Sequence, residues 1–95
     1  MAQERNNPLQ EASQRLVKLY PNPAVSFIKI DFQKKFERGF SLQIINFIGR
    51  QVFELKNINP SSTVDLSSYA RGVYIYQLKD PFGKLVESGK FQVSK

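Results

Sequence analysis

The chain has 95 residues, 41% of them hydrophobic and 13% aromatic, which predicts one globular domain and leaves no room for a second core. Because it contains neither His nor Cys, it lacks the usual general base, the thiol nucleophile, disulfide bonds and most transition-metal sites, so we expect no enzymatic activity, no cofactor and no metal. The formal net charge of +6 would favour polyanions, but the basic residues are spread along the chain, and no apolar run approaches the roughly 20 residues that span a membrane.

Residues 1–15 are polar and carry few bulky apolar side chains, so they are expected to form a linker or leader segment. Met1 followed by Ala2 is typical of an initiator placed before a mature N-terminus. The pattern changes at Leu16, and residues 16–95 are predicted to form a β-sandwich domain. With so short a segment before it, the domain is either excised from a longer protein or a stand-alone protein, and both alternatives stay open.

From Leu16 onward, short β-type runs are separated by turn residues, which is the spacing of an all-β sandwich or barrel. One face of most runs is polar, so the strands are expected to pair antiparallel. The runs are Leu16–Tyr20, Ser26–Phe32, Phe40–Phe47, Arg50–Leu55, a shorter one at Thr63–Leu66, Val73–Leu78 and Lys84–Val93.

Alternation along these runs identifies the side chains that should face the core, because successive residues of a strand point to opposite faces. Val73–Leu78 is apolar on both faces, which predicts a central strand. The expected inner residues are Ile28, Ile30, Phe32, Phe40, Leu42, Ile44, Phe53, Leu55, Phe91 and Val93, and the expected outer ones are Lys29, Asp31, Ser41, Gln43, Glu54, Lys90 and Gln92.

Turn residues separate the predicted strands. Pro21-Asn22-Pro23 should end the first strand abruptly, because each proline fixes φ and removes a backbone donor. Asn46–Gly49 and Asp80–Gly83 predict tight turns between strands. Asp65 is expected to cap a single turn by accepting from the Ser67 or Ser68 amide, with Gly72 as a left-handed exit. A calcium site near Asp65 or Asp80 is an alternative that stays open.

Four segments, read together, point to a known family. They are Leu19-Tyr20-Pro21-Asn22-Pro23-Ala24, then residues 45–52 (INFIGRQV), then residues 64–74 (VDLSSYARGVY), then Lys90-Phe91. In this order and spacing they resemble the type A C-terminal sorting domain of type IX secretion substrates, also called the Por secretion system C-terminal domain. The resemblance covers about residues 16–95.

The resemblance implies an immunoglobulin-like antiparallel β-sandwich of about seven strands from Bacteroidetes. It implies that cargo crosses the inner membrane, folds in the periplasm and is exported because an outer-membrane translocon recognises this domain. It also implies cleavage by a sortase-like peptidase and joining of the cargo to an anionic lipopolysaccharide, at the outer-membrane surface or in the extracellular space. The domain itself would catalyse nothing.

By position, the family's recognition features would fall on three segments, and the last strand has the strongest claim. A terminal edge strand offers unpaired backbone groups for strand addition, to the translocon or to a second copy in a homodimer. The alternative is that these residues only shape turns or fill the core. They are Pro21, Asn22, Pro23, Asp65, Gly72, Lys90, Phe91, Val93 and Lys95.

A second hypothesis is a stand-alone secreted binding module for polysaccharide or an anionic surface, motivated by the net charge and by Tyr20, Tyr69, Tyr74 and Tyr76. For Tyr74 and Tyr76, core or half-buried packing is favoured over a stacking platform. Nucleic-acid binding is the least favoured hypothesis, because the basic residues are scattered, and no nucleic-acid partner is expected.

Overall fold

The computed structural model describes residues 15–32 and 39–95, and residues 1–14 of the predicted leader lie outside this part. The described chain folds into seven strands, and no helix is found among the described residues. The strands are β1 (Val17–Tyr20), β2 (Phe27–Phe32), β3 (Ser41–Ile45), β4 (Gln51–Lys56), β5 (Ser61–Asp65), β6 (Gly72–Lys79) and β7 (Leu85–Val93).

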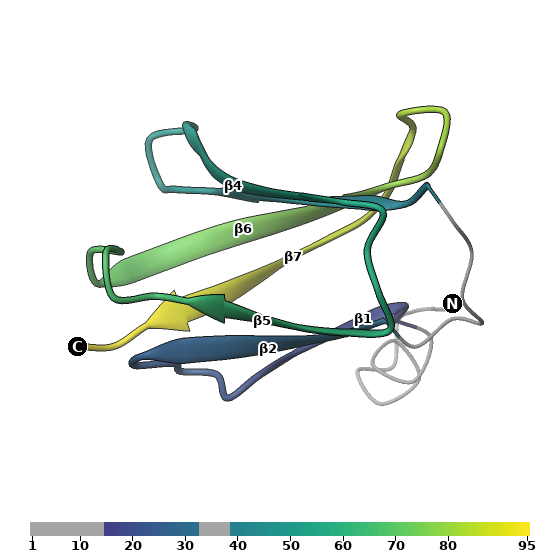
Figure 1. Ribbon diagram of the computed structural model, residues 1–95. Coiled ribbons are helices and arrows are strands. Elements are labelled where there is room, and N and C mark those ends of the chain that lie inside the picture. The colour runs from purple at the N-terminus through teal and green to yellow at the C-terminus, as the bar shows by residue number, and fades with distance from the viewer. Residues whose placement is uncertain (1–14, 33–38) are drawn as a thin grey trace, which may run out of the picture.

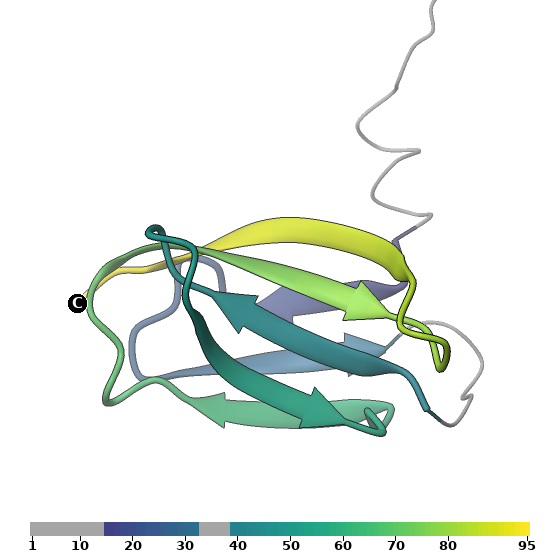
Figure 2. The ribbon, with the colours of Figure 1, turned by 90° about the horizontal axis from the view of Figure 1, so that it is seen from above.

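The strands form two antiparallel sheets that pack face to face (Figures 1 and 2). The smaller sheet has the order β1-β2-β5 and the larger has the order β4-β3-β6-β7. The prediction of an all-β antiparallel sandwich of about seven strands is therefore confirmed. The run Phe40–Phe47 gives a shorter strand than expected, because the chain already turns back after Ile45.

The core lies between the sheets and is filled by the inward side chains that alternation predicts. In β2, Ile28 and Ile30 are fully buried while Lys29 is exposed. Phe32 packs against Phe40 with ring centroids 5.3 Å apart. The other buried apolar residues are Val17, Ala24, Leu42, Ile44, Ile58, Val64, Leu66, Tyr74, Tyr76, Leu78, Phe91 and Val93.

One prediction about the strand faces needs correction. Gln43 was expected on a wet face, but it is buried because β3 lies inside the larger sheet with Glu54 and Gln77 opposite it on either side. The prediction of a central strand is confirmed for β6, which lies between β3 and β7. Val73 and Ile75 on its outer face are 47% and 37% exposed. In the described chain, no element covers that side of the larger sheet (Figure 1).

The two hairpins of the larger sheet are built in the same way. The Asn46 side chain accepts hydrogen bonds from the amides two and four residues later, at 3.2 and 2.9 Å. The Asp80 carboxylate does the same at 2.9 and 2.9 Å. Gly49 and Gly83 then take positive φ values of 89° and 85°, which only glycine adopts without strain. Both predicted turns are confirmed, and Asp80 serves as a turn residue.

Candidate functional site

The loop after β1 is joined to the end of β7, although the two lie about 70 residues apart in the sequence. Ala24 forms a parallel bridge with Val93. The Ala24 amide donates to the Gln92 carbonyl at 2.8 Å, and the Ser94 amide donates to the Ala24 carbonyl at 2.7 Å. The Asn22 side-chain oxygen accepts from the Gln92 amide at 3.0 Å. The loop therefore pairs with the outer edge of β7 near its C-terminal end, on the side opposite β6.

The two prolines place Asn22 for this contact. Pro21, Asn22 and Pro23 are all exposed, whereas the following Ala24 is fully buried. Neither proline has an amide hydrogen to donate. The loop contacts β7 through the side-chain oxygen of Asn22 and through the backbone of Ala24. The predicted turn thus has a defined structural role, and its prolines remain accessible at the surface.

The segment between β5 and β6 forms the capped turn that the sequence predicts. The Asp65 carboxylate accepts from the Ser67 amide at 2.9 Å, so Ser67, rather than Ser68, is its partner. This backbone hydrogen bond, a side-chain hydrogen bond with Ser67 and the nearby charge of Lys95 lower the pKa of Asp65 below its usual value. Gly72 leaves the turn with a positive φ of 147°, as expected.

Lys95 connects this turn to the last strand. Its Nζ donates to the Leu66 carbonyl at 2.6 Å and to the Ser67 carbonyl at 3.1 Å. Three segments far apart in the sequence therefore meet at one end of the sandwich, on the left in Figures 1 and 2. We call their joint surface the terminal face, and define it by the side chains of residues 21–23, 65–72 and 92–95 that are not buried.

Phe91 and Val93 lie beneath the terminal face, not on it, and each is 1% exposed. The Phe91 ring stacks on Tyr74 at a centroid distance of 5.6 Å, and Tyr74 in turn contacts Tyr69 at 5.4 Å. The Tyr74 hydroxyl donates to the Ala70 carbonyl at 2.6 Å, which anchors the 65–72 turn to the core. Of the three predicted recognition residues in β7, Phe91 and Val93 therefore support the terminal face from below.

β7 is an edge strand as predicted, but its edge is less open than expected. The Asn22–Ala24 loop takes both backbone groups of Gln92, and Arg15 donates to the Ser88 carbonyl at 3.3 Å. The backbone groups of successive strand residues point to alternate edges, so Lys90 is the residue between Ser88 and Gln92 whose backbone points to the same edge. Among the described residues, this leaves the backbone of Lys90 as the part of this stretch of β7 where a strand could be added. Lys90 itself lies outside the terminal face.

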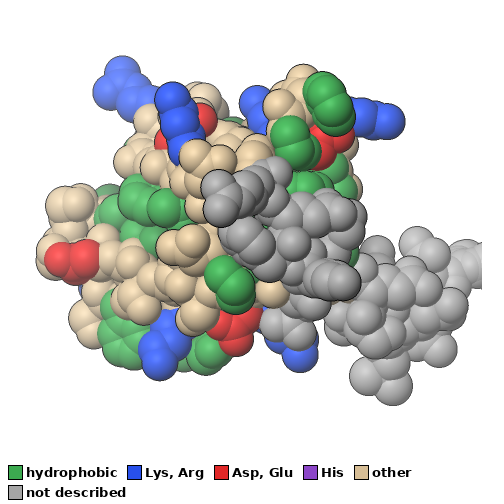
Figure 3. Space-filling view, turned by 45° about the vertical axis from the view of Figure 1, so that its right-hand side comes forward, with side chains coloured by type: hydrophobic (Ala, Val, Ile, Leu, Met, Phe, Trp, Pro, Cys, Tyr) green, Lys and Arg blue, Asp and Glu red, His purple; other side chains and the backbone are tan. Residues whose placement is uncertain are grey.

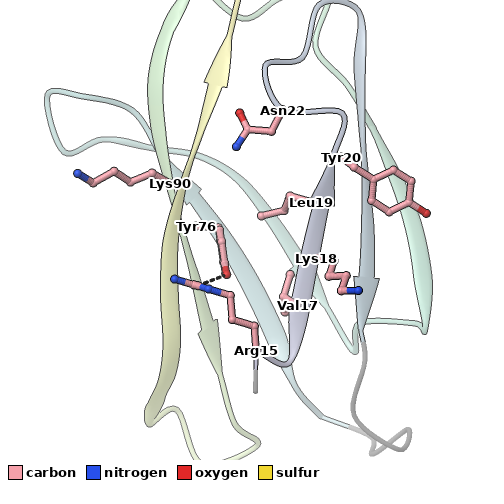
Figure 4. Close-up of a pocket in the computed structure, with 8 residues that line it drawn as sticks. All are labelled: Arg15, Val17, Lys18, Leu19, Tyr20, Asn22, Tyr76 and Lys90. Atoms are coloured by element: carbon pink, nitrogen blue, oxygen red, sulfur yellow. Dashed lines mark hydrogen bonds between the residues drawn. The ribbon is translucent and has the colours of Figure 1, made fainter. Parts of the chain in front are cut away.

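A groove of about 380 Å³ separates the edge strands β1 and β7 (Figure 4). At one end, the Glu87 carboxylate accepts from the Leu16 and Val17 amides at 2.7 and 3.2 Å and from the Tyr76 hydroxyl at 2.8 Å. Arg15 donates to the same hydroxyl at 3.0 Å. Sequence reasoning missed this network, although a carboxylate on the inner side of β7 was a signal for it. The groove is lined by Arg15, Val17, Lys18, Leu19, Tyr20, Asn22, Tyr76 and Lys90.

Tyr76 makes the stability of the fold sensitive to alkaline pH. Burial, followed by the hydrogen bond to Glu87 and its charge, raises the pKa of Tyr76 from 10.0 to about 12. Above pH 10 the unfolded chain loses this proton while the folded chain keeps it, so stability is intact below pH 10 and falls between pH 10 and 12. Urea unfolding should show a loss of about 2–3 kcal/mol over that range beyond the loss in Tyr76→Phe. Equal pH dependence in both proteins would contradict this assignment.

The four tyrosines do not form a common platform. Tyr74 and Tyr76 belong to the core, which confirms the packing preferred for them. Tyr20 lies on the smaller sheet, where its hydroxyl donates to Asp31 at 2.8 Å, and Tyr69 packs at the edge of the core. In the part of the chain that the structure describes, no group of three or more Asp or Glu side chains is placed to hold a metal ion. That part also contains no helix long and apolar enough to cross a bilayer.

Solved structures with the same architecture define the class of the fold. A DUF3244 family protein from Bacteroides vulgatus, with an immunoglobulin-like β-sandwich fold, matches with a TM-score of 0.68 and 10% identity over 86% of this chain and 88% of its own. PorZ, a surface component of the type IX secretion system of Porphyromonas gingivalis, matches with a TM-score of 0.68 and 24% identity. The match covers 83% of this chain but 11% of PorZ. Among curated proteins, none matches the chain.

The chain is thus an immunoglobulin-like β-sandwich, as predicted. The family model described as "Secretion system C-terminal sorting domain" matches residues 18–93, which is nearly the whole described domain. The chain therefore belongs to the family of C-terminal sorting domains of type IX secretion, and its function is that of a sorting signal for export through this system. The resemblance drawn from the four segments is confirmed.

Proposed function

We propose that the secretion translocon of the outer membrane recognises this domain at the terminal face. The observation that supports this proposal is the convergence of three segments through side chains that contact backbone: Asn22 on the Gln92 amide, and Lys95 on the Leu66 and Ser67 carbonyls. These contacts form only when the whole sandwich is folded, because they join residues 70 and about 29 positions apart. A translocon that binds here would accept folded domains and reject unfolded chains.

The proposal also includes the steps of export before and after recognition by the translocon. The domain passes through the periplasm and reaches the outer-membrane surface or the extracellular space, where a sortase-like peptidase separates it from its cargo and the cargo is anchored. In this scheme the domain is a binding partner and has no catalytic role. The exposed terminal face supports a docking function, since its prolines and its capped turn are accessible while the aromatic residues below it are buried.

Export of a fused reporter tests whether the domain suffices as a signal. In cells with a type IX system, a periplasm-directed reporter followed by residues 1–95 should appear outside the cell. Removal of residues 90–95 should keep the reporter in the periplasm, because it deletes the β7 part of the terminal face along with the buried side chains of Phe91 and Val93. Normal export of the truncated fusion would show that the signal lies elsewhere.

A further inference from the structure

We propose that the outer face of the larger sheet, with its two hairpin tips, is a docking surface for an anionic lipid bilayer. The inference goes beyond sorting, because it concerns residues other than those of the terminal face. The two surfaces adjoin at one end of the sandwich, where Asn46 and Val52 line a pocket together with the 65–72 turn. Three independent features support it: the shape of this side, the apolar side chains at its tips, and the charge that surrounds them.

The shape is that of a sheet with a raised hairpin at either end. The β3–β4 and β6–β7 hairpins both rise above the outer face of the larger sheet in Figure 1. Asn46 and Asp80 fix the two turns by the same pattern of hydrogen bonds, so the tips are held in place. Two rigid points at opposite ends of one face suit contact with a flat surface.

The tips carry large apolar side chains that nothing in the described chain covers. Phe47 and Ile48 on the first tip are 82% and 67% exposed, and Phe82 on the second is 94% exposed. Between the tips, the face itself bears Val52, Val73 and Ile75, which are 41%, 47% and 37% exposed. Single exposed apolar residues are ordinary, but a set on one face marks an interaction surface.

The charge on this side favours an anionic partner. The registers place Lys56, Lys79 and Lys90 on the outer face with Glu54. Arg50 and Lys84 follow the two tips and Asp80 lies in the second turn, so basic residues exceed acidic ones here. Figure 3 shows basic side chains at both raised upper corners and hydrophobic ones at the right-hand corner.

Among the described residues, the outer face of the smaller sheet has no such excess and serves as an internal comparison. On the outer face of the smaller sheet, Lys18 lies opposite Asp31, and Asp65 lies opposite Phe27. Lys29 of β2 lies on the same face, between β1 and β5. Basic and acidic side chains are balanced there. Among the described residues, the excess of basic over acidic side chains therefore lies on the outer face of the larger sheet.

Apolar tips that are flanked by basic side chains are complementary to the bilayer interface, where apolar acyl chains meet charged headgroups. Phenylalanine side chains gain from burial at the level of the acyl chains, while Lys and Arg are attracted to anionic headgroups. A soluble polyanion would satisfy the charges but would leave the three apolar tip residues in water. This difference selects a lipid surface over a polysaccharide for this side of the molecule.

Vesicle sedimentation with the full chain tests the proposal. Binding is expected to phosphatidylcholine vesicles that contain about 30% phosphatidylglycerol, to be much weaker with phosphatidylcholine alone, and to fall as salt is raised. Phe47→Ser combined with Phe82→Ser should lower the partition coefficient about tenfold or more, since each ring is then no longer buried. Phe27→Ser, on the smaller sheet, is the matched control and should bind as the unchanged protein does.

Three outcomes would overturn the proposal: equal binding to neutral and anionic vesicles, full binding by the double variant, or an equal loss in the Phe27→Ser control. Binding to dextran sulfate with no binding to anionic vesicles would also overturn it and would indicate a polyanion site. The assay contains no translocon, so its failure leaves the sorting proposal intact. Conversely, the double variant should still export a fused reporter, because the terminal face is unchanged.

Discussion

Replacing Phe91 with Ala is expected to lower the free energy of unfolding by about 3–5 kcal/mol. Phe91 is 1% exposed, stacks on Tyr74 and lies under the terminal face, so its loss leaves a cavity that a small sandwich cannot close easily. A domain of this size has a total stability of roughly 5–15 kcal/mol, so the variant should be close to unfolding at growth temperature. Chemical denaturation followed by circular dichroism measures the change.

Phe82→Ala provides the control for this result, because it removes the same side chain from a position that is 94% exposed. Its effect on stability should stay within about 0.5 kcal/mol. If the two variants lost similar stability, the assignment of Phe91 to the core would be wrong. The comparison also separates folding from recognition, since Phe91 is a residue that the family resemblance alone would place among the recognition features.

The sandwich could be predicted from sequence because most strands carry an alternating apolar face. β5 was the weakest prediction, a short run at Thr63–Leu66, whereas the strand is Ser61–Asp65. The reason is that β5 is an edge strand and buries one side chain, Val64, so its sequence shows little alternation. The burial of Gln43 was missed for a different reason. Its polar side chain predicts an exposed position, but neighbours on both sides of a central strand can bury a polar residue.

The individual turns of the terminal face could also be predicted, but their meeting could not. The Pro21-Asn22-Pro23 loop and the Asp65 cap have local chemical signatures. The contacts that join them use single side chains on backbone groups of distant segments, as Lys95 does on the Leu66 carbonyl. Backbone acceptors are present at every residue, so no pattern in the sequence identifies which one is used.

The groove between β1 and β7 was missed for the same reason. Glu87 accepts from the Leu16 and Val17 amides across 71 and 70 residues, and this contact depends on the two edge strands lying side by side. The edge of β7 is also less open than predicted, because the loop after β1 pairs with Gln92 and Val93. Strand order decides which edges stay free, and the pairing of Ala24 with Val93 is visible only in the folded chain.

Substitutions that change the terminal face without unfolding the domain should have the largest effect on export. Lys95→Met keeps the length of the side chain but removes the charge and both hydrogen bonds to the 65–72 turn, at a cost of about 1–2 kcal/mol in stability. Asn22→Ala removes the acceptor for the Gln92 amide at a similar cost. Both proteins should stay folded, because the side chains lie outside the core.

Export of a reporter fused to each variant is the most direct measurement of whether the translocon recognises the terminal face. Lys95→Met and Asn22→Ala should each lower export about tenfold, which corresponds to about 1.4 kcal/mol of lost binding. Lys29→Met, an equally conservative change on the exposed face of β2, should leave export unchanged. If the terminal-face variants are folded and exported as well as the Lys29 variant, the terminal face is not what the secretion system recognises.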